Sequence, residues 1–317
     1  MSTEPLTEGG VSVARGKLPR CDGGAGSHAT AEDGTRIYFE TFSARGRLGW
    51  DSRREPGDPP PVLSVMGLGA NGRLWAPAVR RLLEGGYDVI AIDNRGCGRS
   101  STPWRPWTTR TMASDAVAVL DELGVERAHV GSASLGGMVA QELALEYPER
   151  VSSVVLGATT GGLPRLDLAS RRGLQIVVEA GVRSLQPASD PDHRVRDWLC
   201  TAVSDDFAAE CRQGDEAWET VAAMLEDPVS PRGLALQVLA ALRHSSWSRL
   251  PRLGIPVQVH HGTEDPLIPF SAGRELARRI PGAEFVVHEG AGHALILERP
   301  EECWLNIRRF LGQCERA

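Results

Sequence analysis

The stretch Val130-Gly131-Ser132-Ala133-Ser134-Leu135-Gly136-Gly137-Met138 decides the fold, because it runs from an apolar segment through a serine into a helical segment. Residues 128–133 have the composition of a buried strand, and apolar residues recur every four positions from Val139, as one helix face requires. So tight a turn from strand to helix strains the backbone and needs small neighbours. The pattern therefore predicts that the Ser134 hydroxyl is exposed at a helix N-terminus.

The rest of the chain repeats this alternation of strand and helix. Such a repeat predicts an α/β fold with a mostly parallel sheet covered by helices on both faces. Ligands are expected in the loops that follow the carboxyl ends of the strands. The predicted strands are 62–66, 89–92, 128–133, 151–156, 257–260 and 283–288, and a hairpin around Asp33-Gly34 is predicted from 29–32 and 35–41. The predicted covering helices are 74–83 and 112–123, and a closing helix is predicted at 301–311.

Composition divides the chain into three parts. Residues 1–27 carry few apolar side chains, and we expect a disordered N-terminal tail. Residues 28–160 and 251–317 carry the strand and helix pattern and form the predicted core. Residues 161–250 contain helix-like pieces with proline-marked joints and are too long for a plain loop. We expect them to form a helical cap over the strand ends.

Charge and cysteine content limit the class of protein. The 317 residues carry a formal net charge of -6 and no basic tract, so nucleic acid and membrane are not expected as partners. The six cysteines show no zinc-ligand spacing, and we expect reduced thiols, no metal and no cofactor. Without an apolar run of signal-peptide or membrane-span type, the expected location is cytoplasmic. The expected partner is a small-molecule substrate, and the sequence does not indicate the oligomeric state.

Two later loops supply the groups that a nucleophilic serine needs, a base and an acid that orients it. The loop of residues 261–269 places Asp265 just beyond a strand end, with Glu264 as the rival acid. The glycine-flanked loop of residues 289–294 presents His293. The chain order Ser134, Asp265, His293 is the order expected for a hydrolase with a serine at a strand-to-helix turn.

Acyl transfer also needs hydrogen-bond donors where negative charge develops on the substrate oxygen. The loop of residues 66–72 follows the strand 62–66 and can bring a backbone amide close to the serine. The predicted oxyanion-hole donors are the backbone N–H groups of Leu68 and Leu135.

These motifs together resemble the α/β-hydrolase superfamily from about residue 29 to residue 311. The resemblance is carried by Met66-Gly67-Leu68-Gly69, Asp93-Asn94-Arg95-Gly96-Cys97-Gly98-Arg99-Ser100, the serine turn, Gly262-Thr263-Glu264-Asp265 and Gly292-His293. It implies Ser134 as nucleophile, His293 as general base and acid, and Asp265 as the group that orients His293. Within the superfamily the chain looks most like capped esterases, enol-lactonases and methylesterases, including those that tailor aromatic polyketides.

Two positions depart from the family pattern. Met66 stands where the oxyanion loop commonly has histidine, and catalysis should survive because the donor is a backbone amide. Ser132 stands where the turn commonly has glycine, which loosens the turn or adds a hydrogen bond. Ser132 could itself be the nucleophile, but two residues beyond it lies Ser134, whereas two residues beyond Ser134 lies Gly136.

Several further residues have both a functional and a structural interpretation. His260 and His261 could suggest a metal pair, but adjacent strand residues point to opposite faces. Asp93, Arg95 and Arg99 are interpreted as a hydrogen-bonded turn that braces the floor of the site. Four candidates could contact substrate or simply pack in a core: Trp75, Leu267, Trp198 and Trp218.

The sequence thus predicts a serine hydrolase that cleaves a carboxylic ester or lactone of a small organic molecule through an acyl-enzyme. A second hypothesis keeps the same three residues for hydrolysis of a carbon–carbon bond, or for acyl transfer or cyclisation in secondary metabolism. A third is a ligand-binding protein of this fold without catalytic activity.

Overall fold

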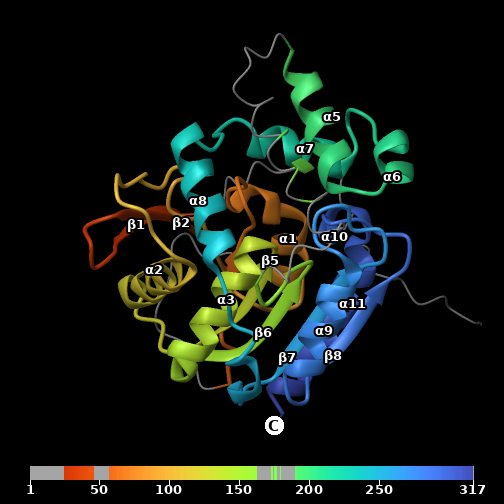
Figure 1. The fold of residues 1–317 in the computed structure, drawn as a ribbon. Coiled ribbons are helices and arrows are strands. Elements are labelled where there is room, and N and C mark those ends of the chain that lie inside the picture. The colour runs from red at the N-terminus through yellow and green to blue at the C-terminus, as the bar shows by residue number, and fades with distance from the viewer. Residues whose placement is uncertain are drawn as a thin grey trace, which may run out of the picture.

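An eight-stranded sheet forms the centre of the protein (Figure 1). The computed structural model describes residues 25–45, 57–162 and 190–316, with residues 173, 175, 176 and 179 between them. The strand order is β1-β2-β4-β3-β5-β6-β7-β8, antiparallel from β1 to β4 and parallel from β4 to β8. The strands are β1 Ala25–Thr30, β2 Arg36–Phe42, β3 Val62–Val65, β4 Val89–Ile92, β5 Ala128–Ala133, β6 Val151–Gly157, β7 Val257–Gly262 and β8 Glu284–His288.

The first two strands confirm the predicted hairpin but correct the predicted tail. Residues 1–24 lie outside the described residues, whereas residues 25–27 belong to β1 and not to a tail. They pair with β2 up to Ala25 opposite Thr41. Backbone hydrogen bonds to a neighbouring strand order these residues, and a count of apolar side chains does not register such bonds.

The helices follow the expected alternation. Predicted helix 74–83 is a 3-10 turn, Gly72–Trp75, that leads into α1. Predicted helix 112–123 begins three residues earlier because the Thr108 side chain caps it by accepting from the Thr111 amide. The helices of the core are α1 Ala76–Glu84, α2 Thr109–Glu122, α3 Leu135–Glu146, α9 Phe270–Arg279, α10 Leu295–Glu298 and α11 Pro300–Cys314, with short 3-10 turns at Pro148–Arg150 and Leu250–Arg252.

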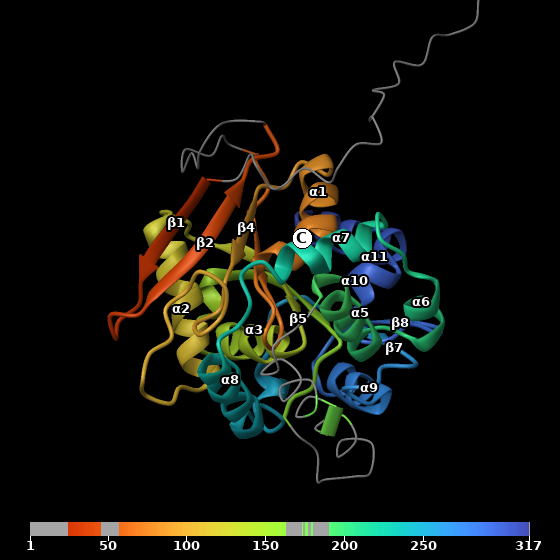
Figure 2. The ribbon, with the colours of Figure 1, turned by 90° about the horizontal axis from the view of Figure 1, so that it is seen from above.

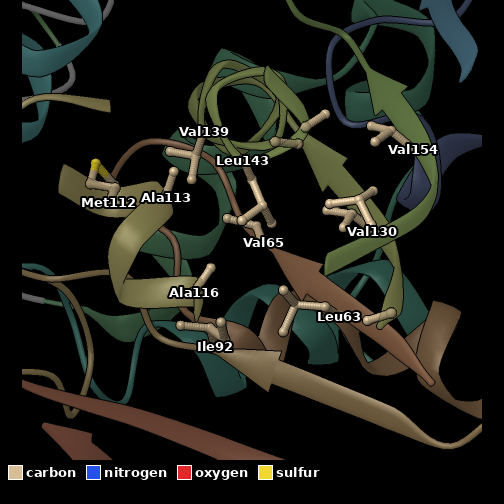
Figure 3. Packing of buried hydrophobic residues seen from close by; sticks show 14 of the residues in the cluster. Leu63, Val65, Ile92, Met112, Ala113, Ala116, Val130, Val139, Leu143 and Val154 are labelled. Carbon is tan, nitrogen blue, oxygen red and sulfur yellow. The ribbon is translucent and has the colours of Figure 1, made fainter. Parts of the chain in front are cut away.

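Each face of the sheet has its own apolar layer. Helices α2, α3 and α9 contribute to the cluster on one face, and α1 and α11 to the cluster on the other. Figure 3 shows Leu63, Val65 and Val130 of the strands facing Val139 and Leu143 of α3. Strands β3 and β4 are buried at every position, as expected of parallel strands that are covered on both faces.

Four helices lie between β6 and β7 in the described residues 190–250, within the region where a helical cap was predicted (Figure 2). They are α5 Pro191–Ala202, α6 Asp205–Glu210, α7 Glu216–Met224 and α8 Pro231–Arg243, and we call them the cap. Gln237 of α8 accepts a hydrogen bond from the amide of Gly69, which follows the carboxyl end of β3. The cap therefore lies over the strand ends, where ligands were expected. None of the helices described is long and apolar enough to span a membrane.

The apolar layers lead to a test of stability. Leu143 is fully buried between α3 and the sheet, whereas Leu305 of α11 is 70% exposed. We expect Leu143→Ala to lower the free energy of unfolding by about 2–5 kcal/mol, because it removes buried methyl groups and leaves a cavity. The same change at Leu305 should cost less than about 0.5 kcal/mol. Urea unfolding of both variants checks this, and equal losses would contradict the layer assignment.

Candidate active site

The turn between β5 and α3 holds Ser134 in a strained conformation. Its backbone has φ 54° and ψ -121°, in the region that L-residues rarely adopt. A Cβ on Gly136 would lie 2.1 Å from the Val65 carbonyl oxygen, and one on Gly137 would lie 2.6 Å from Thr159. Only glycine permits these approaches. The Ser134 side chain makes no capping hydrogen bond and lines a cavity, so a role as an ordinary helix cap is excluded.

Ser132 has a different environment. Its side chain is buried, and its hydroxyl donates to the Val155 carbonyl oxygen at 2.7 Å. Of the two effects expected for serine at this position, the structure shows the added hydrogen bond. The hydroxyl ties β5 to β6, which favours Ser134 over Ser132 as the reactive serine.

Asp265 and His293 lie side by side, as the two loops predicted. His293 Nδ1 is 2.8 Å from Asp265 Oδ2, and Asp265 Oδ1 accepts from the amides of Leu267 and Ile268 at 2.8 and 2.9 Å. If His293 donates through Nδ1, its Nε2 carries the lone pair that a base needs. His293 lines the same cavity as Ser134. The rival acid, Glu264, is exposed.

The Asp265 carboxylate is held in its ionised form. Burial of this side chain would raise its pKa, but His293 and His261 together lower the pKa below its usual range. His261 Nε2 lies 3.3 Å from Asp265 Oδ2 and 3.0 Å from the Ile268 carbonyl oxygen. Sequence reasoning gave His261 only a packing role and missed this contact. Its position four residues before Asp265 was the available signal.

The two adjacent histidines of β7 face opposite sides of the sheet, as predicted. The Nδ1 atom of His260 lies 2.9 Å from Nε2 of His288 in β8. Cys303 of α11 lies beside both rings, and the nitrogen and sulfur atoms with which these three side chains could bind a metal are within 4.8 Å of one another. Burial lowers the pKa of His260 to about 3 and raises the pKa of the Cys303 thiol to about 12. Hydrogen bonding between the two rings accounts for the contact, and the sequence spacing gave no sign of it.

The predicted oxyanion loop passes directly against the serine. A Cβ on Gly67 would lie 3.0 Å from the Ser134 Cβ. Leu68 and Leu135 both line the cavity, and within the described ranges neither backbone amide donates to a protein acceptor. Asn94 Nδ2 donates to the Met66 carbonyl oxygen at 2.7 Å, so the start of the loop is fixed. The N–H groups of Leu68 and Leu135 therefore remain the predicted donors to a substrate oxygen.

The cap anchors both loops that flank the serine. Gln237, fully buried, accepts from the Gly69 amide at 2.9 Å and donates to the Arg95 carbonyl oxygen at 3.0 Å. At the other loop, the Ala202 carbonyl oxygen of α5 accepts from the amides of His293 and Ala294 at 2.9 and 2.7 Å. No sequence signal marks Gln237, because its partners lie far away in the chain.

The cavity has a volume of about 750 Å³ and takes in most of the predicted pocket residues. Trp75, Leu267 and Trp198 line it together with Ser134. Trp218, also predicted to contact substrate, does not line it. Its ring is 3% exposed and packs in the apolar cluster that joins the cap to α1 and α11. The tryptophan therefore stabilises the cap, which was the structural interpretation of this residue.

Comparison with known proteins identifies the family. Residues 60–300 match the family described as the alpha/beta hydrolase fold. The chain belongs to the α/β hydrolase fold family. A relative from Mycobacterium tuberculosis, with the provisional name non-heme bromoperoxidase BpoC, is 33% identical over 80% of this chain and 94% of its own. A poly(3-hydroxyalkanoate) depolymerase from Ectopseudomonas oleovorans is 31% identical over 81% of this chain and 87% of its own. The crystal structure of a hydrolase from Pseudomonas aeruginosa superimposes with a TM-score of 0.73 and 26% identity, covering 90% and 98% of the two chains.

In this α/β hydrolase the turn that follows β4 braces the floor of the site. The buried Asp93 carboxylate accepts from the Gly72 amide at 2.8 Å and from Arg99 Nε at 3.1 Å. Arg95 is buried and pairs with Asp115 at 2.5 Å. Asp93 thus ties the end of the loop of residues 66–72 to this turn, and Arg95 ties the turn to α2, as expected of a hydrogen-bonded structural turn.

The contrast between the two serines of this α/β hydrolase can be tested with a fluorophosphonate probe. We expect Ser134→Ala to abolish labelling, because Ser134 lines the cavity and is the predicted nucleophile. Ser132→Ala is the matched control; it loses the hydrogen bond to Val155, costs about 1 kcal/mol of stability and stays labelled. Intact-protein mass spectrometry measures the adduct. Labelling of Ser134→Ala at the wild-type rate would exclude Ser134.

The lowered pKa of Asp265 predicts how stability depends on pH. A carboxyl group whose pKa is lower in the folded protein adds stability above its unfolded pKa of about 3.9, and this stability is lost as pH falls through the folded pKa. The difference in unfolding free energy between wild type and Asp265→Asn should therefore be largest near neutral pH and shrink in acid. Urea unfolding across a pH series measures it. A difference that stays constant would contradict the prediction.

Proposed function

We propose that the protein is a serine hydrolase that cleaves a carboxylic ester or lactone of a small organic molecule through an acyl-enzyme. One observation carries the proposal. Ser134, which is strained and caps no helix amide, opens into the same cavity as the hydrogen-bonded pair of His293 and Asp265, beside two amides with no protein acceptor.

The proposed first step is attack of Ser134 Oγ on the substrate carbonyl carbon. His293 Nε2 takes the hydroxyl proton as the bond forms, and the imidazole becomes a cation. The buried Asp265 carboxylate, 2.8 Å from His293 Nδ1, stabilises that cation and keeps the tautomer correct. The lowered pKa of Asp265 ensures that the carboxylate is ionised at neutral pH.

The tetrahedral intermediate carries negative charge on the former carbonyl oxygen. The amides of Leu68 and Leu135 are the proposed donors to that oxygen, and the loss of one such donor typically slows an enzyme by about 100- to 1,000-fold. Collapse of the intermediate expels the alcohol, which receives the proton from His293. A water molecule then attacks the acyl-enzyme with His293 again as base, and Ser134 is regenerated.

The family relationship supports this choice of reaction. One relative is named poly(3-hydroxyalkanoate) depolymerase. The units of that polymer are joined by ester bonds. Trp75, Trp198 and Leu267 are the proposed substrate contacts, since all three line the cavity.

Hydrolysis of p-nitrophenyl butyrate tests the proposal. We expect Asp265→Asn to reduce kcat by about 10⁴-fold, because the imidazole loses the acceptor that fixes its tautomer. Ser134→Ala should fall to the background rate. Glu264→Gln is the matched control; it makes the same chemical change on the exposed neighbour and should leave the rate at the wild-type level.

Three other outcomes would count against the proposal. Equal loss in Glu264→Gln and Asp265→Asn would remove the specific role of Asp265. Turnover of vinylogous diketones without turnover of any ester or lactone would indicate cleavage of a carbon–carbon bond. Stoichiometric ligand binding with no turnover of aryl esters, lactones or diketones would indicate a non-catalytic protein.

A further inference from the structure

The cavity that contains Ser134 has an arm that follows the sheet away from the cap. Its lining continues from Ser134 along β5 as far as His129 and includes residues of α1 and α11. This arm lies between the sheet and the two helices that cover this face. It is thus a part of the same cavity that lies away from the cap helices and joins the space beneath them at Ser134.

The lining of the whole cavity includes every residue of β5 from His129 to Ala133, and the lining residues that face α1 and α11 lie on one face of their element. On β5 they include His129, Gly131 and Ala133, which alternate along the strand and so share one face. On α11 the lining residues include Ile307 and Leu311, which are four residues apart and share one helix face. From Ala133 to His129 the strand advances about 13 Å at the usual rise per residue. The arm is thus elongated and runs along β5.

Gly131 and Ala133 show that this space is open. Strand β5 lies between β3 and β6 with helices on both faces, so full burial is expected at every position. Val130 and Ser132 are indeed buried, whereas Gly131 and Ala133 remain partly accessible. Accessible surface in the middle of a central strand that helices cover indicates open space between that strand and the helices.

Gly131 is not required by backbone geometry or by packing. Its φ does not lie in the positive region, unlike that of Gly34 or Gly69. A Cβ on Gly131 would meet its nearest atoms, Val62 Cγ1 and Ser64 Oγ, at 3.6 and 4.0 Å, which are ordinary contacts. Glycine weakens a strand interior, because it costs conformational entropy and offers no side chain to pack. What glycine provides here is space.

The walls of the arm are mainly apolar and favour apolar ligands, although Ser64, Arg81 and His129 also line the cavity. Leu82 of α1 faces the arm together with Ile307 and Leu311 of α11. Polar groups that enter such a site lose water without gaining partners, whereas a hydrocarbon chain gains from burial. An elongated, apolar space that opens at the reactive serine fits an extended chain attached to the scissile group.

We propose that this arm binds the unbranched hydrocarbon chain of the ester substrate, so that the enzyme prefers esters of longer fatty acids or alcohols. The inference rests on the proposed function, because it places the chain beside Ser134. Each methylene group that moves from water into an apolar site strengthens binding by roughly fourfold. Over several methylene groups this effect dominates the choice of substrate.

The test measures how kcat/KM depends on chain length after the arm is filled. Gly131→Val places an isopropyl group of three carbons in the arm, and Gly131→Ala places a single methyl group. Gly254→Val makes the same change as Gly131→Val on an exposed loop where no atom lies within 4 Å of the added Cβ. The substrates are p-nitrophenyl acetate, butyrate and octanoate, together with ethyl and octyl acetate. Thermal unfolding checks that each variant is folded. If Gly131→Val does not fold, the smaller change Gly131→Ala still tests the proposal.

In the wild type we expect kcat/KM for octanoate to exceed that for butyrate by at least about tenfold, or octyl acetate to exceed ethyl acetate by as much. Gly131→Val should reduce that ratio by about tenfold or more, Gly131→Ala should reduce it less, and Gly254→Val should keep it. The substrate series that responds identifies the acyl or the alcohol chain as the occupant.

Two outcomes overturn the inference. In one, the wild type hydrolyses esters without the expected preference for the longer chain; in the other, both Gly131 variants leave that preference unchanged. If the wild type hydrolyses none of these esters, the proposed function fails instead.

Discussion

The close approach of α3 to the end of β3 is the constraint on which the site depends. At Gly136 the helix passes so near the Val65 carbonyl that a Cβ would lie 2.1 Å from the oxygen. This approach forces the chain to turn within one residue, which places Ser134 at φ 54°. Such a conformation costs about 1–3 kcal/mol, and the packing of α3 on the sheet offsets this cost. In return the hydroxyl stands free at the N-terminus of a helix.

Everything else in the site is held relative to that turn by buried polar contacts. On one side Asn94 and Gln237 fix the loop that carries the Leu68 amide, and Asp93 fixes the end of that loop. On the other side Ala202 of the cap holds the backbone of His293. Because two of these anchors belong to the cap, the cap contributes to the geometry of the site as well as covering it.

Glycine has two opposite roles within seven residues of this chain, 131–137. Gly136 and Gly137 are glycine because neighbouring atoms leave no room for a Cβ. Gly131 has room for one, and its absence leaves an accessible space in a covered strand. From the sequence alone all three residues are small residues near a serine. The distance to the surrounding atoms, set by how β3, α1 and α11 pack, separates the two roles.

Local patterns were sufficient for most elements and for the pairing of Asp265 with His293. Strands 89–92 and 128–133 have the predicted bounds, and Asp265 and His293 meet as their loops indicated. These features depend on short-range periodicity and turn residues, which a stretch of ten to fifteen residues already contains. The ordering of residues 25–27 was missed, because it depends on backbone pairing with β2.

Only the tertiary structure decided which side chains face the cavity and what holds the loops. Trp218 packs inside the cap cluster, Gln237 reaches Gly69, and His261 contacts Asp265. Such contacts depend on the angle at which one element packs on another, and residues distant in the chain contribute to that angle. The sequence by itself therefore determined the fold and the candidate reactive groups, whereas the packing of helices on the sheet and of the cap on the core determined the shape of the site.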